Sequence, residues 1–221
     1  MQLFDKITVI IPTHERHQYL KRSLDYWSQS EFQILVVDSS GDKFQGQVPD
    51  NINYFHYPNK PFVEKLIDGL GKIDTEYTVL CADDDFITPT GLNACIEFLE
   101  DNKDYIVAHG QYIAIVPPGN NLEPDGHFCW RQKYLSASNE FEDAVDRLRY
   151  HFKNYSCPTF YGVHRTSIML LIQQETEKHT NETRFAEPNR KDQLSDELGK
   201  LGLKRYSFGL DSGGSNVSQI N

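Results

Sequence analysis

The chain has 221 residues, 38% of them hydrophobic and 24% charged, which suits one folded domain, or one domain with a small second lobe. Its formal net charge of −10 argues against nucleic acid or an anionic membrane surface as a partner, because both are negatively charged. An acidic protein that handles an anionic ligand must instead supply positive charge locally, from a metal ion or a few lysine and arginine side chains.

The four cysteines show neither a CxxC pair nor a close histidine spacing, so zinc and redox sites are not favoured. We expect free, mostly buried thiols in a reducing compartment. No apolar run approaches the ~20 residues of a membrane span, and the N-terminus lacks a signal-peptide pattern. These features predict a cytoplasmic protein with no transmembrane segment, and membrane association through a partner or a substrate stays open.

The first half of the chain alternates strand and helix patterns. Short apolar runs that end in turn residues predict strands at 7–11, 33–37, 53–57 and 77–82. Apolar residues at helical spacing predict helices at 18–29, 62–73 and 91–102. Repeated strand–helix–strand units of this kind indicate an α/β fold with a mostly parallel central sheet flanked by helices.

The second half is less regular. Strands are predicted at 105–116, as one long strand or a hairpin, and at 159–164. Helices are predicted at 167–174 and at 140–152, the latter with Phe141, Ala144, Val145 and Leu148 on its apolar side. Composition predicts a loop at 117–126, a mobile segment or lid at 175–197 and disorder from about 211.

Three consecutive carboxylates, Asp83, Asp84 and Asp85, follow the predicted strand at 77–82. Their mutual repulsion is costly unless a cation or solvent relieves it. If the segment continues as a strand, Asp83 and Asp85 face one site while Asp84 faces elsewhere. Two carboxylates on one side suit Mn²⁺ or Mg²⁺, which take oxygen ligands and often bridge to phosphates. A solvated acidic turn is the alternative, which the position after a buried strand disfavours.

Two further polar segments follow strands, and the ends of parallel strands meet at one edge, where ligands bind. Asp38 ends the second strand and either accepts hydrogen bonds from a nucleobase or ribose, or makes an Asx-type turn. Thr13 and Glu15 suit base or ribose contacts, and Arg16 offers a fork of donors for phosphate. Thr13 also suits a helix cap and Glu15 a first helical turn, and these roles are compatible with ligand contacts.

Lys60 and Lys65 flank the third predicted strand and the helix that follows it, where either ammonium group is placed to neutralise phosphate. A solvated surface position is the simpler interpretation of each. Neither GxGxxG nor GxxxxGK[ST] occurs, which argues against dinucleotide or P-loop chemistry. The histidines show no HExxH or similar spacing, so none is assigned to a metal.

The segments TVIIPTHERHQYLKRSL, ILVVDSS and EYTVLCADDDFITPTGL, within about residues 5–102, together resemble the GT-A fold glycosyltransferases of the inverting family 2 type. The resemblance implies a Rossmann-like fold that moves a sugar from a UDP- or GDP-sugar to the hydroxyl of a carbohydrate or lipid-linked acceptor. It implies Asp85 as the principal metal ligand and Asp83 as a contact of the ribose or of metal-bound water. Asp83 and Asp85 together are the predicted metal residues. With Lys65 added, the predicted nucleotide-binding set is Pro12, Thr13, Glu15, Arg16, Asp38, Lys65, Asp83 and Asp84.

The same resemblance divides the chain into a nucleotide-sugar-binding half at 1–102, an acceptor-binding half at 103–210 and a tail at 211–221. Inverting members carry a catalytic carboxylate late in the domain, often as Glu-Asp, and no Glu-Asp follows the strand at 159–164. Glu187 is the nearest candidate for the catalytic base. Glu142, Asp143 and Asp192 are its rivals. Trp130 either stacks on an acceptor sugar or belongs to the core.

Other functions stay open at this stage. A sugar-phosphate nucleotidyltransferase uses a related sheet but wants a glycine-rich loop after the first strand, where this chain has PTHER. An aspartate-based phosphohydrolase would place its acidic motif after the first strand rather than the fourth. A non-catalytic carbohydrate- or nucleotide-binding module of the same fold is the alternative outside enzymes. The oligomeric state is not fixed by the sequence, and a homodimer is compatible with it.

Overall fold

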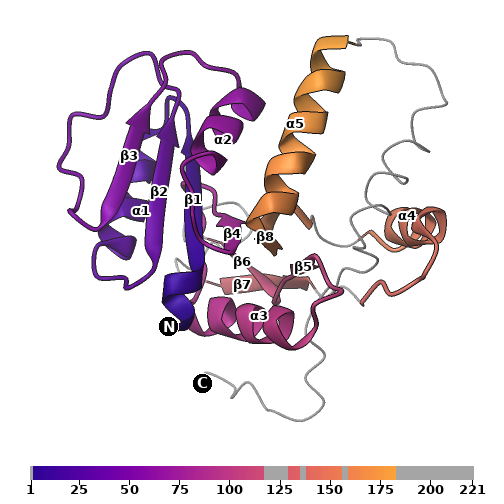
Figure 1. The fold of residues 1–221 in the computed structure, drawn as a ribbon. Helices are drawn as coiled ribbons and strands as arrows, with labels where there is room; N and C mark the ends of the chain where they lie inside the picture. Colours follow the sequence, from indigo (N-terminus) through magenta and orange to yellow (C-terminus); the bar gives the residue numbers. More distant parts are fainter. Residues whose placement is uncertain (1, 117–128, 135–137, 156–158, 183–221) are drawn as a thin grey trace.

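The computed structural model describes residues 2–116, 129–134, 138–155 and 159–182. Its main sheet has six strands in the order β3-β2-β1-β4-β8-β5 (Figure 1). Four neighbouring strands are parallel, namely β1 (Ile7–Thr13), β2 (Gln33–Asp38), β3 (Ile52–His56) and β4 (Tyr77–Leu80). β8 (Val163–Arg165) runs antiparallel to β4 and to β5 (Val107–Ala108). The expected α/β fold with a mostly parallel sheet is confirmed, with one reversed strand.

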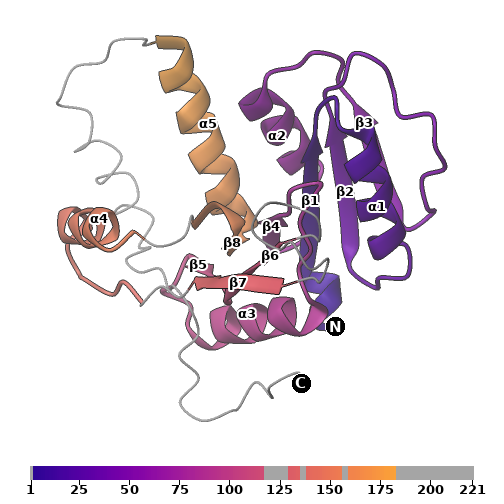
Figure 2. The ribbon, with the colours of Figure 1, turned by 180° about the vertical axis from the view of Figure 1, so that it is seen from behind.

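Both faces of the sheet are covered by helices, because successive residues of a strand point to opposite sides. The covering helices are α1 (His17–Trp27), α2 (Phe62–Leu70), α3 (Pro89–Asp101) and α5 (Thr166–Glu182). In β1, Val9 and Ile11 pack into one core with apolar residues of α1 and α3, whereas Ile10 packs with residues of α2 and α5. Figures 1 and 2 show α2 and α5 side by side, with α1 on the opposite face.

The segment 105–116 is neither one strand nor a hairpin. It splits between β5 in the main sheet and β6 (Tyr112–Val116), which pairs antiparallel with β7 (Cys129–Tyr134) in a separate two-stranded sheet. His109 and Gly110, between the two strands, separate these pairings. The strand expected at 159–164 is also shorter, because 159–161 form a 3-10 turn, η2 (Thr159–Tyr161), before β8.

Two helices of the second half differ from expectation. The helix expected at 140–152 begins later, as α4 (Ala144–Lys153), because Asp143 caps its first turn by accepting hydrogen bonds from the Val145 and Asp146 amides. The apolar side of α4 is exposed rather than packed against the sheet, at Val145 and Leu148, and Phe141 just before the helix is exposed as well. The helix expected at 167–174 continues to Glu182, so the part of the predicted lid before residue 183 is helical.

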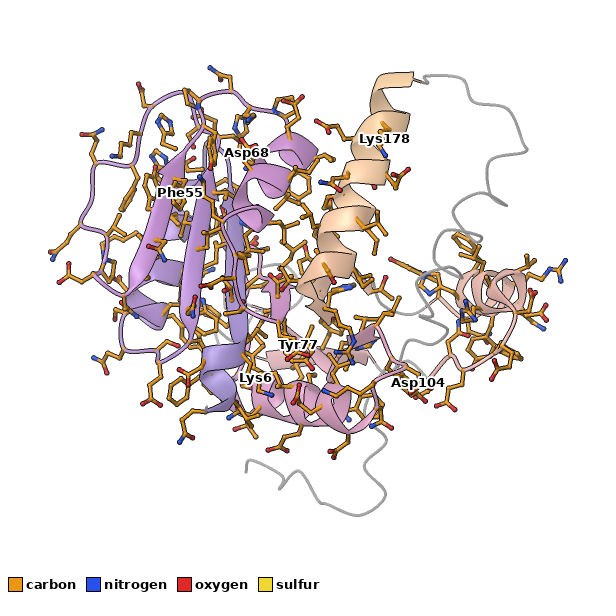
Figure 3. All side chains as sticks on the ribbon, viewed as in Figure 1. Lys6, Phe55, Asp68, Tyr77, Asp104 and Lys178 are labelled. Carbon is orange, nitrogen blue, oxygen red and sulfur yellow. The ribbon has the colours of Figure 1, made fainter. Side chains whose placement is uncertain are left out.

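A set of polar contacts fixes the end of the sheet at which β1 and β4 begin. Lys6, in the 3-10 turn η1 (Leu3–Lys6), forms an ion pair with Glu100 of α3, and the Tyr77 hydroxyl donates to the same carboxylate at 2.5 Å. Figure 3 shows Lys6 and Tyr77 at this end of the sheet and Asp68 of α2 away from it. The donors lower the pKa of Glu100 to about 2, so the contact persists at neutral pH.

Cys81 and Cys95 are buried free thiols, as expected; the other two side chains lie outside the described part. In the described ranges, no helix combines the length and the apolar character needed to cross a bilayer.

Gly69 lets α2 pack directly on the sheet. A Cβ at this position would lie 2.7 Å from Val37 Cγ1 and 2.9 Å from Ile10 Cδ1. We therefore expect Gly69→Ala to lower the free energy of unfolding by about 1–3 kcal/mol, even though alanine favours helices. Urea denaturation measures this loss.

Gly71→Ala is the matched control. Gly71 ends the same helix in right-handed backbone geometry, and its added Cβ would meet Ile67 O at an ordinary 3.4 Å. We expect its unfolding free energy to stay within about 1 kcal/mol of the wild type. Equal values for the two variants would contradict the close packing of α2.

Candidate functional site

The polar segments that follow β1, β2 and β4 meet at the carboxyl edge of the sheet, the upper ends of these strands in Figure 1. Thr13 pairs in register with Asp38, because β1 and β2 end at the same level. On the other side, the Thr13 hydroxyl donates to Asp83 Oδ2 at 2.6 Å. Thr13 thus joins the end of β2 to the acidic triplet beyond β4.

Lys65 is buried beneath this edge, with 2% of its surface exposed. Its ammonium donates to Thr13 O at 2.5 Å and to Ser39 Oγ at 2.9 Å. Desolvation lowers the pKa of Lys65 to about 8, against the opposing effect of the Asp38 and Asp83 charges. The expectation of a solvated lysine is wrong here, because α2 starts at the carboxyl edge and turns this side chain toward the strand ends. Lys60, about one-third exposed, pairs instead with Asp68.

Asp38 is fully buried and holds neighbouring groups of the protein. Its Oδ2 accepts hydrogen bonds from the Tyr54 hydroxyl at 2.5 Å and from His17 Nε2 at 3.1 Å, and Oδ1 accepts from the Ser40 amide at 2.8 Å. Burial alone would raise the pKa of Asp38, but the bonds from Ser40, Tyr54 and His17 outweigh it and lower the pKa. The Ser40 contact is the Asx-type turn that the sequence allowed.

Glu15 adopts a left-handed backbone conformation, with φ of 53°, which is uncommon for a residue other than glycine. Its amide donates to Ser40 Oγ at 2.8 Å, and its carboxylate accepts from the Gly41 amide at 2.6 Å. Glu15 therefore fastens the loop after β2 to the loop after β1. Neither Thr13 nor Glu15 serves α1 as cap or first turn, because β1 extends to Thr13 and α1 starts only at His17, after Arg16.

The acidic triplet lies in a turn rather than in a strand. β4 ends at Leu80, and the Asp85 amide closes the turn on Ala82 O at 3.1 Å. The alternation expected for Asp83 and Asp85 along a strand therefore does not apply. Asp83 is 3% exposed, whereas Asp85 is exposed. Partial desolvation is the main cause that raises the pKa of each, and the charge of Asp84 adds to it.

Arg16 is the cation that faces the triplet. It lies 3.3 Å from Asp83 Oδ1 through NH1 and donates to Asp84 Oδ2 at 2.5 Å through NH2. In the part of the chain that the structure describes, no hydrogen bond or ion pair reaches the carboxylate of Asp85. Of the three carboxylates, Asp83 accepts from Thr13 and faces Arg16, and Asp84 pairs with Arg16. Asp85 has no such partner among the described residues.

The donor set fits a cation that is shared with a ligand. Within the described ranges, no three His, Cys, Asp or Glu side chains cluster to form a metal cage. One or two carboxylates together with substrate phosphates are the usual ligands of Mg²⁺. Asp83 and Asp85 therefore suit Mg²⁺ or Mn²⁺ held jointly with phosphate, and the Arg16 guanidinium already provides positive charge at this position.

Further residues that the sequence interpretation missed lie beside the triplet. Arg22 donates to Asp84 O at 3.0 Å, and the Tyr26 hydroxyl donates to Ile87 O at 2.9 Å, so α1 anchors the acidic loop. The sequence could have indicated Arg22 and Tyr26, because residues 16, 19, 22 and 26 lie at the spacing of one helix face. Tyr161 of η2 had no signal. Its pKa is raised by burial first and then by the charges of Asp85 and Asp84.

The candidates of the second half are placed only in part. Trp130 lies on β7, and its side chain is outside the described part of the structure. Glu187 and Asp192 lie outside the described residues. Asp143 caps α4, a structural task that occupies one of its oxygens.

The chain is similar to known proteins in its sequence pattern and in its fold. The family model described as "Glycosyl transferase family 2" matches residues 8–169, which is well over half of the chain. A search of the curated proteins finds no match.

Solved structures show the same fold. The chain is similar to S. aureus TarS 1-349, with a TM-score of 0.52 and 17% identity over 91% of this chain and 57% of that chain. The same portion in complex with UDP gives a TM-score of 0.51 and 18% identity, with the same coverage. This chain thus spans less than two thirds of those structures. A mannosyltransferase of Pyrobaculum calidifontis, PcManGT, in complex with GDP-Man and Mn²⁺, matches with a TM-score of 0.39 and 17% identity, over 48% of this chain and 35% of that chain, too low to support a conclusion.

The hydrogen bond from Tyr54 to Asp38 can be tested by removing one oxygen atom. Tyr54→Phe leaves a buried carboxylate short of a donor and the Phe44 amide without its acceptor. We expect the free energy of unfolding at pH 7 to fall by about 1–3 kcal/mol, measured by urea denaturation.

Tyr57→Phe is the control, because the Tyr57 hydroxyl is buried without a hydrogen-bond partner among the described residues. Its loss should change the unfolding free energy by less than about 0.5 kcal/mol or increase it. Equal losses in the two variants would argue against a special role of the Asp38 contact.

Burial of Lys65 predicts a pH dependence of stability with a definite sign. Its pKa falls from 10.5 to about 8 on folding, so the unfolded chain binds more protons between these pH values. The stability of the wild type relative to Lys65→Met should therefore rise from pH 8 to pH 10.5, by up to about 3 kcal/mol. Urea denaturation at several pH values in this window measures the difference.

Lys60→Met supplies the opposite case. The hydrogen bond to Asp68 raises the pKa of Lys60, so its contribution to stability is lost as the pH rises through that value. The wild type should therefore show no rise in stability relative to Lys60→Met between pH 8 and pH 10.5, and should lose stability relative to it only above pH 10.5. A rise between pH 8 and pH 10.5 that is absent for Lys65, or present for both lysines, would contradict the burial of the Lys65 charge.

Proposed function

Because this chain belongs to glycosyl transferase family 2, we propose that it transfers a sugar from a nucleoside-diphosphate sugar to an acceptor hydroxyl at the carboxyl edge of the sheet. The family expected from the sequence is confirmed, and a nucleotidyltransferase is disfavoured. The donor we propose is a UDP- or GDP-sugar, and the acceptor a carbohydrate or a lipid-linked carbohydrate. On this proposal residues 1–102 bind the donor, and residues 103–210 bind the acceptor.

The observation that carries the proposal is the arrangement of charge around Thr13. Asp83 is held in place by Thr13, whose carbonyl accepts from the buried Lys65, while Asp85 stands exposed beside it. Such an edge offers fixed carboxylates for a cation and fixed positive charge for a diphosphate. Both are needed where a sugar leaves a nucleoside diphosphate.

We assign Asp85, with Asp83, as the ligands of Mn²⁺ or Mg²⁺. When bound, such an ion neutralises charge on the leaving diphosphate. Arg16, which is 41% exposed, supplies a fork of donors for the phosphate oxygens. Lys65 contributes positive charge to the site without contacting the phosphate, because its ammonium donates to Thr13 and Ser39 within the protein.

The nucleoside is assigned to the ends of β1 and β2. Pro12 and Thr13 end β1, Glu15 is exposed in the loop that follows, and Asp38 ends β2. Asp38 is fully buried and already accepts bonds from His17 and Tyr54, so contact with a base requires movement of the groups that cover it. Glu15 and the groups around it are therefore the more accessible part of the proposed base-binding surface.

For the acceptor we propose a single in-line displacement with inversion. Glu187 is proposed as the base that removes the acceptor proton, and Trp130 as a stacking surface for the acceptor sugar. The rival Asp143 is less suited, because one of its carboxylate oxygens already caps α4. The base assignment thus rests on the late position of Glu187 in the chain.

Asp85→Ala tests the metal assignment. Removal of the exposed carboxylate should lower transfer or donor hydrolysis at least ~100-fold without unfolding the protein, because this side chain has no internal role in the described structure. The measurement is release of UDP or GDP from the corresponding donor sugars with Mn²⁺, followed with and without EDTA. Circular dichroism checks the fold.

Asp25→Ala serves as the control, since Asp25 is an exposed carboxylate on α1 that pairs only with Lys21 among the described residues. It should keep wild-type activity. Full turnover in EDTA would contradict the metal assignment. Thermal stabilisation by UDP or GDP with Mn²⁺, without any turnover, would instead point to the non-catalytic binding module.

A further inference from the structure

Arg16 faces the carboxylate oxygen of Asp83 that does not bond to Thr13. One oxygen of Asp83 accepts from Thr13, and the other faces Arg16 NH1 at 3.3 Å. The second nitrogen of the same guanidinium donates to Asp84. Arg16 thus offsets the charge of two of the three carboxylates.

The guanidinium also stacks on an aromatic ring while it contacts the carboxylates. Its carbon lies 4.4 Å from the centre of the Tyr19 ring, one turn further along α1. Arginine stacks well on an aromatic face, and its planar fork binds phosphate through two parallel hydrogen bonds. Arg16, which is partly exposed, can thus leave the carboxylates without losing every favourable contact.

We propose that Arg16 takes the place of the metal ion in the nucleotide-free protein and moves to the diphosphate when nucleotide and metal bind together. This inference rests on the proposed function, since it assumes a cation at Asp83 and Asp85. A guanidinium next to these carboxylates repels a divalent ion, so metal binding alone is weak. A diphosphate draws Arg16 away and adds ligands of its own. Arg16 therefore couples the two binding events, and the coupling is reciprocal.

Arg22 shows why the assignment falls on Arg16. It lies on the same helix and close to the same turn, but it donates to the main-chain oxygen of Asp84 rather than to a carboxylate. Its guanidinium also lies 5.2 Å from the centre of the Phe86 ring and 5.5 Å from that of Tyr19. Arg22 therefore anchors the loop through the main chain of the loop, whereas Arg16 makes the contacts to the carboxylate oxygens.

The test is isothermal titration of Mn²⁺ into the nucleotide-free protein. Arg16→Gln removes the charge and keeps part of the stem, and it should bind Mn²⁺ about tenfold more tightly than the wild type. Arg16→Lys keeps the charge and should stay within about threefold of the wild type. Lys21→Gln is the control and should also stay within about threefold, because it removes an exposed charge of the same helix that pairs with Asp25. Arg16→Met gives a second neutral variant, with the same expected gain, if Arg16→Gln does not fold.

A second titration, in saturating UDP or GDP, measures the coupling. The factor by which nucleotide strengthens Mn²⁺ binding should be large for the wild type and smaller for Arg16→Gln. Mn²⁺ affinity in the nucleotide-free neutral variants that is equal to or weaker than that of the wild type overturns the role of Arg16. A wild type that binds no Mn²⁺ even with UDP or GDP overturns the proposed metal site itself, which is a different result.

Discussion

The buried ammonium group of Lys65 is the interaction on which the carboxyl edge of the sheet depends. It binds the last carbonyl of β1 and the hydroxyl of Ser39 after β2. The side chain of Thr13 continues the connection to Asp83 beyond β4. A buried charge is costly unless it has hydrogen-bond partners. The partners of Lys65 lie at the ends of β1 and β2, and Thr13 links these ends to the residues after β4. The polar segments are thus held at this edge by contacts between buried side chains as well as by the topology of the sheet.

Much of this arrangement follows from local sequence. Runs such as ITVII predict strands buried on both faces, and β1 does send Val9 and Ile10 into different cores. Once four such strands are parallel, topology alone brings Thr13, Asp38 and Asp83 to the same edge. The acidic triplet was identifiable because a run of like charge after an apolar strand has few structural explanations.

The remaining features depend on contacts between distant residues. Burial of Lys65 requires α2 to start above the strand ends, and enclosure of Asp38 requires Tyr54, which is 16 residues away in the sequence. β8 has only three residues, too few to carry a pattern that could announce its reversed direction. The amphipathic pattern of α4 correctly indicated a helix, but it could not tell that the apolar side, with Val145 and Leu148, is exposed.

The reversed direction of β8 determines the end of the sheet at which α5 begins. Because Arg165 pairs with Tyr77, the first residue of β4, the chain leaves β8 at the end of the sheet remote from Asp85. α5 has 17 residues and rises by about 25 Å. The seven residues of β1 span a similar distance of about 23 Å. In Figure 1, α5 runs beside α2 toward the level where β1 ends. The helix is about as long as the sheet is deep, so the chain returns at Glu182 to the level of the carboxyl edge of the sheet.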